Sequence, residues 1–249
     1  LKVLFFTGCM GDKVYPNVTE ACLKIFKHYG IGVAMPSGLA CCGIPALASG
    51  DADSFKKMAA YNLDILGKLE FDYVVTACAS CTETIEQFWP RYAEGAQKAT
   101  AEKISAKTLD ISAFLVDVIG LEKPAQARVG AEGGRREKVT YHDSCHLAKS
   151  LGVRRQPREL VKANPECELI EMREPGTCCG CGGSFTLTHY DISKKIGGRK
   201  RDNIVASGAD TVACGCPACM MQISNMLALN GDEVKVKHVA ELYADSLDK

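Results

Sequence analysis

The chain has 249 residues, of which 47% are hydrophobic, and its 30 Lys and Arg balance its 30 Asp and Glu. This composition excludes a disordered chain, and the length is sufficient for two small domains that each bury a core. Because basic residues are not in excess, we do not expect nucleic acid as a partner. The sequence shows neither a signal peptide nor a membrane-length apolar run, which predicts a cytoplasmic protein with no direct membrane span, peripheral to a membrane only through its partners.

Cysteine is the residue type that stands out, with 14 in the chain. This density is too low for a small disulfide scaffold and far above that of an ordinary cytoplasmic enzyme. Without an export signal, metal or redox chemistry is favoured over disulfides. The chain begins at Leu1, already inside an apolar run, so we expect the native protein to be longer.

Strand and helix patterns alternate through the first half of the sequence. Short apolar, β-rich runs at 2–7, 32–35 and 73–77 predict strands, and helical patterns occupy 17–29 and 53–68. Strands that alternate with helices of this length indicate βαβ units and a parallel sheet. Each cysteine group follows a strand or its exit loop, and the group members are Cys9, Cys41, Cys42, Cys78 and Cys81.

The second half repeats this plan, with strands at 138–142, 168–172 and 211–213 and helices at 157–163 and 191–207. Five cysteines recur after 136 to 138 residues, and the matched pairs are Cys9 and Cys145, Cys41 and Cys178, Cys42 and Cys179, Cys78 and Cys216, and Cys81 and Cys219. Such regular recurrence indicates an internal duplication.

The duplication predicts two tandem domains. Helical patterns at 110–117 and 238–245 close the two halves with similar sequences. A glycine-rich, charged stretch at 130–137 is the expected linker, with an N-terminal repeat at 1–129 and a C-terminal repeat at 138–249. We therefore expect an α/β protein of two repeats, each with its own parallel sheet.

The cysteine spacing predicts a metal group with several thiolate ligands. A Cys-x-x-Cys turn lets two sulfurs face a common point, and five thiolates are one too many for a tetrahedral zinc ion. Adjacent cysteines in a strand would point to opposite faces, so each doublet must lie in an irregular loop, for which Gly43 and Gly180 supply the backbone freedom. Because loops at the carboxyl ends of parallel strands gather at one edge, the three groups of each half can meet.

The doubled pattern, with the flanking stretches 141–146 (YHDSCH) and 178–185 (CCGCGGSF), resembles the cysteine-rich CCG domain family. That family includes the heterodisulfide reductase B-subunit and the iron-sulfur subunits of glycolate oxidase, anaerobic glycerol-3-phosphate dehydrogenase and lactate utilisation complexes. The resemblance covers nearly the whole chain. It implies that each half is Rossmann-like. It also implies that a complete set of five cysteines can hold a [4Fe-4S] cluster, which can be of the non-cubane type. In the N-terminal half, zinc is an alternative to the cluster. The implied ligands are Cys9, Cys41, Cys42, Cys78, Cys81, Cys145, Cys178, Cys179, Cys216 and Cys219.

The resemblance also implies a function. The surroundings of Cys145 and Cys178 are closer to the lactate and glycolate branch, which implies an iron-sulfur electron-transfer subunit of an oxidoreductase complex. Its expected partners are an FAD-containing dehydrogenase subunit and other iron-sulfur subunits, with no catalytic residue on this chain. Two alternatives stay open: thiol/disulfide chemistry of the heterodisulfide reductase type at a non-cubane cluster, and a zinc-bound interaction module. Several relatives carry a preceding ferredoxin-like domain, which fits a longer native chain.

The remaining polar and thiol residues have simpler expectations. Cys22 and Cys167 are predicted to be small buried residues. We expect His142 and His146 to orient the loop of Cys145 through hydrogen bonds, with a ligand role as the alternative. The basic runs at 154–158 and 199–201 are interpreted as solvated helix faces.

Overall fold

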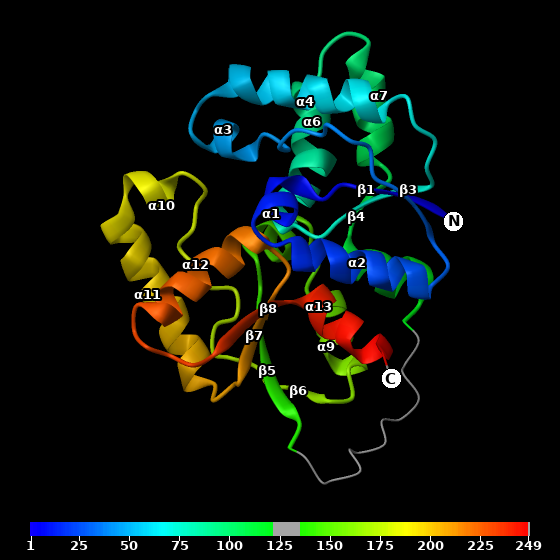
Figure 1. The fold of residues 1–249 in the computed structure, drawn as a ribbon. Coiled ribbons are helices and arrows are strands. Elements are labelled where there is room, and N and C mark those ends of the chain that lie inside the picture. Colours follow the sequence, from blue (N-terminus) through cyan, green and yellow to red (C-terminus); the bar gives the residue numbers. More distant parts are fainter. Residues whose placement is uncertain (122–134, 249) are drawn as a thin grey trace. The chain divides into compact units, whose positions relative to one another are not determined.

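A computed structural model describes residues 1–121 and 135–248, and Figure 1 shows its elements. The chain divides into two compact units, Leu1–Ile111 and Ser112–Lys249. Residues 130–134 of the predicted linker lie outside the described residues, and Glu137 already belongs to a strand. The predicted domain limits at 129 and 138 therefore stay predictions.

The first unit is a parallel sheet with helices on both faces. Its strands are β1 (Lys2–Phe5), β2 (Gly32–Ala34), β3 (Tyr73–Thr76) and β4 (Thr108–Asp110), in the order β2-β1-β3-β4. Helix α2 (Pro16–His28) covers one face, and α4 (Ala52–Leu66) and α7 (Gln97–Ser105) cover the other (Figure 1). The shorter helices are α1 (Gly8–Lys13), α3 (Ile44–Ala48), α5 (Ala79–Glu83), η1 (Thr84–Phe88), α6 (Trp89–Tyr92) and α8 (Ile111–Ala113).

The second unit repeats this arrangement. Its strands are β5 (Glu137–His142), β6 (Cys167–Leu169), β7 (Thr211–Cys214) and β8 (Lys235–His238), in the order β6-β5-β7-β8, all parallel. Helices α9 (Arg155–Ala163) and α13 (Val239–Asp245) lie on one face, and α11 (Tyr190–Ala206) and α12 (Pro217–Ala228) on the other (Figure 1). The shorter helices are η2 (Phe114–Ile119), η3 (His146–Ser150), α10 (Phe185–Thr188) and η4 (Ser246–Asp248). The predicted fold class, two α/β repeats with parallel sheets, is confirmed.

Helix α4 illustrates how the sequence specifies these elements. The Asp51 side chain accepts a hydrogen bond from the Ser54 backbone N–H at 2.9 Å and so caps the first turn. Phe55, Leu63 and Leu66 recur at helical spacing and are fully or almost fully buried. Burying each such side chain contributes about 1.5–3 kcal/mol, so the apolar face holds α4 on the sheet.

The strand order creates a switch point in each sheet. From β1 the chain crosses to the edge strand β2, whereas from β3 it continues to β4 on the opposite side. The carboxyl ends of two neighbouring strands with opposite onward connections leave a crevice between their loops, which is the usual ligand site of open α/β sheets. Cys9 follows β1 and Cys78 follows β3. The cysteines therefore occupy the edge where a ligand site is expected.

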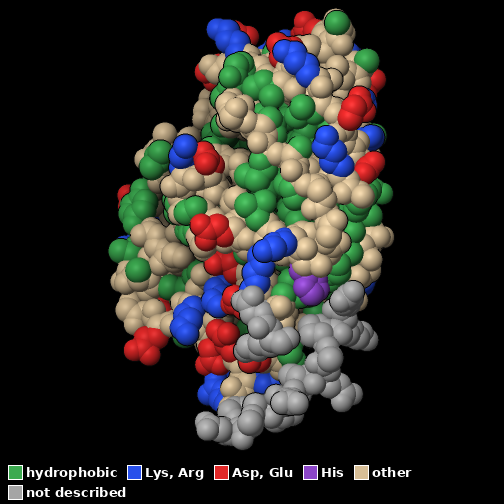
Figure 2. Space-filling view, turned by 45° about the vertical axis from the view of Figure 1, so that its right-hand side comes forward, with side chains coloured by type: hydrophobic (Ala, Val, Ile, Leu, Met, Phe, Trp, Pro, Cys, Tyr) green, Lys and Arg blue, Asp and Glu red, His purple; other side chains and the backbone are tan. Residues whose placement is uncertain are grey.

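The surface carries both signs of charge. On the face drawn in Figure 2, Lys and Arg side chains are interspersed with Asp and Glu among apolar residues. In the part of the chain that the structure describes, no helix combines the length and the apolar character that crossing a membrane requires.

Candidate metal centres

The first cysteine set joins three loops through its sulfur atoms. Cys9 is the second residue of α1, the Cys41-Cys42 doublet precedes α3, and Cys78 and Cys81 begin α5. The Sγ atoms of Cys9 and Cys41 lie 3.6 Å apart. Further sulfur contacts link Cys41 to Cys42, Cys42 to Cys81, and Cys81 to Cys78. All five predicted ligands of this half are thus in one connected group.

The second set has the same order of contacts. Cys145 contacts Cys178, which contacts Cys179. The Sγ atoms of Cys179 and Cys219 lie 3.3 Å apart, and Cys219 contacts Cys216. The structure therefore brings together all ten predicted residues as two groups of five. None of the fourteen cysteines, which all lie in the described part of the chain, forms a disulfide.

Each doublet turns at a glycine in the left-handed region, as the sequence predicts. Gly43 has φ of 97° and Gly180 has φ of 89°. A Cβ atom at Gly43 would lie 2.7 Å from the Phe55 ring, and one at Gly180 would lie 2.6 Å from the Ser193 carbonyl oxygen. Only glycine fits both the backbone conformation and the space, and the turn lets two adjacent sulfurs face the same group.

The Cys-x-x-Cys pairs occupy helix N-termini with nearly identical backbones. Cys78 has φ and ψ of −147° and 110°, and Cys216 has −149° and 114°. Cys78 and Cys216 occupy the N-cap positions of their helices, and Cys81 and Cys219 lie in the first turn. The positive end of a helix dipole favours thiolate over thiol, but contacts with neighbouring sulfurs and burial raise the pKa of Cys81 and Cys219 well above the usual range. Both pairs would therefore become anionic ligands when a metal group adds positive charge.

The sulfurs in each set cannot all ionise without added positive charge. Hydrogen bonds from Cys42 and then from Cys9 lower the pKa of Cys41 to about 2, while hydrogen bonds to Cys41 raise the pKa of both of those neighbours. The second set behaves alike: hydrogen bonds from Cys145 and then Cys179 lower the pKa of Cys178 to about 2. A metal group would supply the missing charge and displace the remaining protons. Five converging sulfurs therefore fit a polynuclear thiolate-ligated group.

Neutral groups hold the doublet loop of the first unit. The Asn62 side chain accepts from the Ala40 N–H at 2.9 Å and donates to the Cys41 carbonyl at 3.0 Å. The indole N–H of Trp89 donates to the Cys42 carbonyl at 2.9 Å. Asn62 and Trp89 are both fully buried, so these bonds fix the doublet with no charged side chain.

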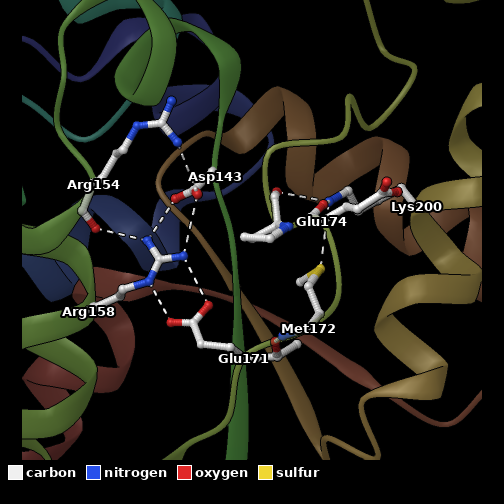
Figure 3. A network of polar contacts seen from close by, with 9 residues as sticks. Asp143, Arg154, Arg158, Glu171, Met172, Glu174 and Lys200 are labelled. Atoms are coloured by element: carbon white, nitrogen blue, oxygen red, sulfur yellow. Dashed lines mark hydrogen bonds and ion pairs between the residues drawn. The ribbon is translucent and has the colours of Figure 1, made fainter.

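Charged groups hold the corresponding region of the second unit, as Figure 3 shows. Arg158 donates to Asp143 at 2.7 Å and to Glu171 at 2.6 Å, and Arg154 lies 3.5 Å from Asp143. The Asp143 carboxylate is almost fully buried at the end of β5, two residues before Cys145. The prediction of a solvated face at 154–158 is therefore wrong for Arg158, whose side chain is only 16% exposed because it pairs with this carboxylate.

Lys200 is a second exception to the predicted solvated faces, because it is 0% exposed. Its ammonium donates to the Pro175 carbonyl at 2.9 Å, to the Glu174 carbonyl at 3.2 Å and to the Met172 sulfur at 3.6 Å (Figure 3). These hydrogen bonds fix the segment that leads into Cys178. The neighbouring Arg199 and Arg201 face outward and pair with acidic residues.

His142 lies beside the second sulfur group with its polar atoms unused. Its ring is fully buried, and neither ring nitrogen has a hydrogen-bond partner among the described residues. One ring nitrogen and the sulfurs of Cys179 and Cys219 all lie within 4.8 Å of one another. Burial, and then the charge of Lys200, lower the pKa of His142 to about 4. Instead of orienting the Cys145 loop by hydrogen bonds, a neutral imidazole faces the sulfurs, and its unpartnered nitrogen fits a bound metal group.

The cysteines outside the two sets divide into two kinds. Cys22 and Cys167 are buried, and their prediction as small core residues is confirmed. Cys181 and Cys214 are buried close enough to the second set to interact electrostatically with Cys216. Their spacing of two residues from a predicted ligand is the sequence signal for that placement.

Comparisons with known proteins agree with this geometry. The sequence profile of the cysteine-rich domain, CCG, matches residues 3–86 and 139–224. The B chain of the fumarate reductase (CoM/CoB) of Methanothermobacter marburgensis is 33% identical over 97% of this chain and 45% of its own length. Lactate utilization protein A of an Exiguobacterium species is 30% identical over 97% of this chain and 96% of its own length.

A protein of Methanocaldococcus jannaschii named as an uncharacterized iron-sulfur protein is 34% identical over 95% of this chain and 44% of its own length. This chain thus spans less than half of two of these relatives and nearly all of the third. Because the domain profile matches twice, over more than half of the chain, this protein belongs to the cysteine-rich CCG domain family, with two copies of the domain.

Proposed function

We propose that this chain is an iron-sulfur electron-transfer subunit of an oxidoreductase complex of the lactate or glycolate type. The observation that carries the proposal is the pair of equivalent five-sulfur groups, each at the switch point of its own parallel sheet. The near full-length similarity to lactate utilization protein A supports the choice of complex.

The ten cysteines would hold the clusters, and the rest of the chain would tune them. When bound, an iron-sulfur cluster accepts and returns single electrons. The helix N-termini at Cys78 and Cys216 would stabilise the ligating thiolates, and burial of Cys42 and Cys179 excludes water from their sulfurs. Cys9, Cys41, Cys145 and Cys178 are less buried than their partners, which leaves one side of each group accessible to an electron donor or acceptor.

The substrate chemistry is assigned to a partner chain. Oxidation of a 2-hydroxy acid removes two electrons, which a flavin can accept and pass on singly. The sequence carries no nicotinamide motif after its first strand, and the buried His142 faces sulfurs, so it is not placed to abstract a substrate proton. An FAD-containing dehydrogenase subunit is therefore the proposed donor, in a complex that includes other iron-sulfur subunits.

Anaerobic reconstitution tests the proposal. The wild-type chain should acquire iron and acid-labile sulfide together with a brown colour, and should be reduced by lactate or glycolate only when a flavin subunit is added. Zinc alone in both sets would overturn the redox function and favour an interaction module. Substrate oxidation by the isolated chain with an artificial acceptor would overturn the relay.

Direct thiol/disulfide chemistry is the second candidate. The similarity to the B chain of fumarate reductase (CoM/CoB) and the accessible sulfurs of Cys145 and Cys178 favour it. Titrating the reduced, iron-loaded chain with mixed disulfides while its paramagnetic signal is followed separates the two. A new paramagnetic species that forms in stoichiometric amount together with disulfide cleavage would establish thiol/disulfide chemistry. An unchanged paramagnetic signal would instead favour the electron-transfer function.

A further inference from the structure

The two repeats place different side chains at one equivalent position. The 138-residue spacing that relates Cys78 to Cys216 also relates Asn62 to Lys200. Both residues are fully buried in the helix that precedes the central strand, and both bond to the backbone just ahead of or within their cysteine doublet. The same helix position thus carries a neutral amide in the first unit and an ammonium in the second.

The hydrogen bonds of Lys200 match a protonated amine. An ammonium has three donors and no acceptor, and three acceptors surround it: the Pro175 carbonyl, the Glu174 carbonyl and the Met172 sulfur. A neutral amine would leave a buried lone pair without a donor. Burial lowers the pKa of Lys200, whereas the three acceptors favour the ammonium form, in which Lys200 is a buried cation.

No carboxylate in the described part of the chain forms an ion pair with this cation. The nearby Glu174 carboxylate pairs instead with Arg199, at 2.7 Å. A charge that is buried without a counter-ion destabilises the folded chain. The helix that carries Lys200 packs against the second doublet: a Cβ atom at Gly197, one turn before Lys200, would lie 3.0 Å from the Cys179 carbonyl oxygen. The charge is thus held beside the second cysteine set.

We propose that Lys200 is a positioning residue whose charge raises the reduction potential of the cluster held by the second cysteine set. This inference rests on the proposed function. One-electron reduction adds one negative charge to a group that is already anionic, because five thiolates outweigh the charge of the iron core. A fixed cation nearby stabilises the reduced form more than the oxidised form. Asn62 offers no such charge to the first set.

Potentiometric titration of anaerobic, iron-loaded protein tests this, with dithionite as the one-electron reductant and the paramagnetic signal as the readout. A Cys42→Ser background removes the signal of the first set. In that background, Lys200→Met should lower the reduction equilibrium constant of the second cluster at least tenfold, which is about 59 mV for one electron. Lys200→Arg, which keeps the charge, should stay close to the parent, as should Asn62→Met, the matched change in the first repeat.

Every outcome bears on the proposal. An iron-loaded Lys200→Met protein with an unchanged potential would overturn it. If Lys200→Met and Lys200→Gln both lose iron while Lys200→Arg retains it, the positive charge is required and the proposal stands. If all three variants lose iron, Lys200 acts through packing and the proposal is overturned. A wild-type chain without iron would overturn the proposed function as well, which distinguishes the two failures.

Discussion

Both repeats connect their five sulfurs in the same order, but the side chains behind the sulfurs differ. The spacing between Cys9 and Cys145 places Phe6 opposite His142 and Thr7 opposite Asp143. The first group is backed by apolar and neutral residues, and the second by an imidazole, a buried carboxylate and a buried ammonium. The duplicated fold has kept the positions of the ligands while their electrostatic surroundings have diverged.

This difference teaches that holding a metal group and tuning it are separable in this fold. The glycine turn, the helix N-termini and the sulfur contacts recur in both units and concern ligation. The charged network occurs around the second set, and groups of this kind tune a metal centre. Substitutions can therefore address the two tasks one at a time.

The largest expected effect is loss of one centre without the other. Cys179→Ser removes a sulfur from the middle of the second group and should abolish its iron signal, while Cys22→Ser and Cys167→Ser, both buried outside the sets, should leave iron content unchanged. Anaerobic metal analysis and paramagnetic resonance measure this. A full signal of the second centre in Cys179→Ser would contradict the role of this sulfur as a ligand.

The glycine turns should differ in their tolerance of a methyl group. Left-handed backbone costs about 1–2 kcal/mol for alanine, and overpacking adds about 1–3 kcal/mol. Gly180→Ala should lose more stability, because the new Cβ meets the Ser193 backbone, whereas the new Cβ in Gly43→Ala meets the side chain of Phe55.

Urea unfolding followed by circular dichroism measures the two variants, and the fluorescence of Trp89, the only tryptophan, reports on the first unit. Gly198→Ala is the control, because that helical glycine has open space and alanine should stabilise the protein by about 1 kcal/mol. Equal losses at Gly43 and Gly180 would contradict the difference in packing.

The ion-pair network should matter only where it is buried. Arg158→Met leaves the buried Asp143 carboxylate without its main partner and should destabilise the second unit by about 3 kcal/mol. Arg155 lies on the same helix as Arg158 and forms an exposed ion pair with Asp117. Arg155→Met breaks this pair and should lower the free energy of unfolding by about 0–1 kcal/mol. Denaturant unfolding of both variants measures this. Similar losses in the free energy of unfolding would contradict the role of burial.

The smallest expected effect concerns the neutral support of the first set. Trp89→Phe leaves the buried Cys42 carbonyl without its donor, which should cost about 2 kcal/mol and weaken iron retention in the first set alone. Tyr61→Phe, at an exposed site of the same unit, should change stability by less than about 0.5 kcal/mol. An unchanged unfolding midpoint in Trp89→Phe would show that the indole hydrogen bond does not stabilise the doublet loop.

The alternating patterns were sufficient to predict the repeats and the main elements, because each βαβ unit carries its own periodicity. The edge strands β4 and β8 were missed: three or four residues give too short a pattern beside the longer helical segments that follow them. Convergence of the sulfurs was predictable because each cysteine group follows a strand of a parallel sheet, and the loops at the carboxyl ends of such strands gather at one edge.

The surroundings of the sulfurs were not predictable from residue types. Lys200 was grouped with exposed basic neighbours because its acceptors are backbone carbonyls 25 and 26 residues away, which leave no trace in the sequence. His142 stood out beside Cys145, yet it faces Cys179 and Cys219, which only the folded chain brings near it.

All five sulfurs of each group come from within one unit, the first between Cys9 and Cys81 and the second between Cys145 and Cys219. A mutation that empties one centre therefore leaves every ligand of the other in place. Natural selection can then preserve one copy while the other changes its metal, shifts its potential or decays, with no compensating change elsewhere. The duplication is in this sense a starting point for diversification of the two sites, since each copy can evolve at its own rate.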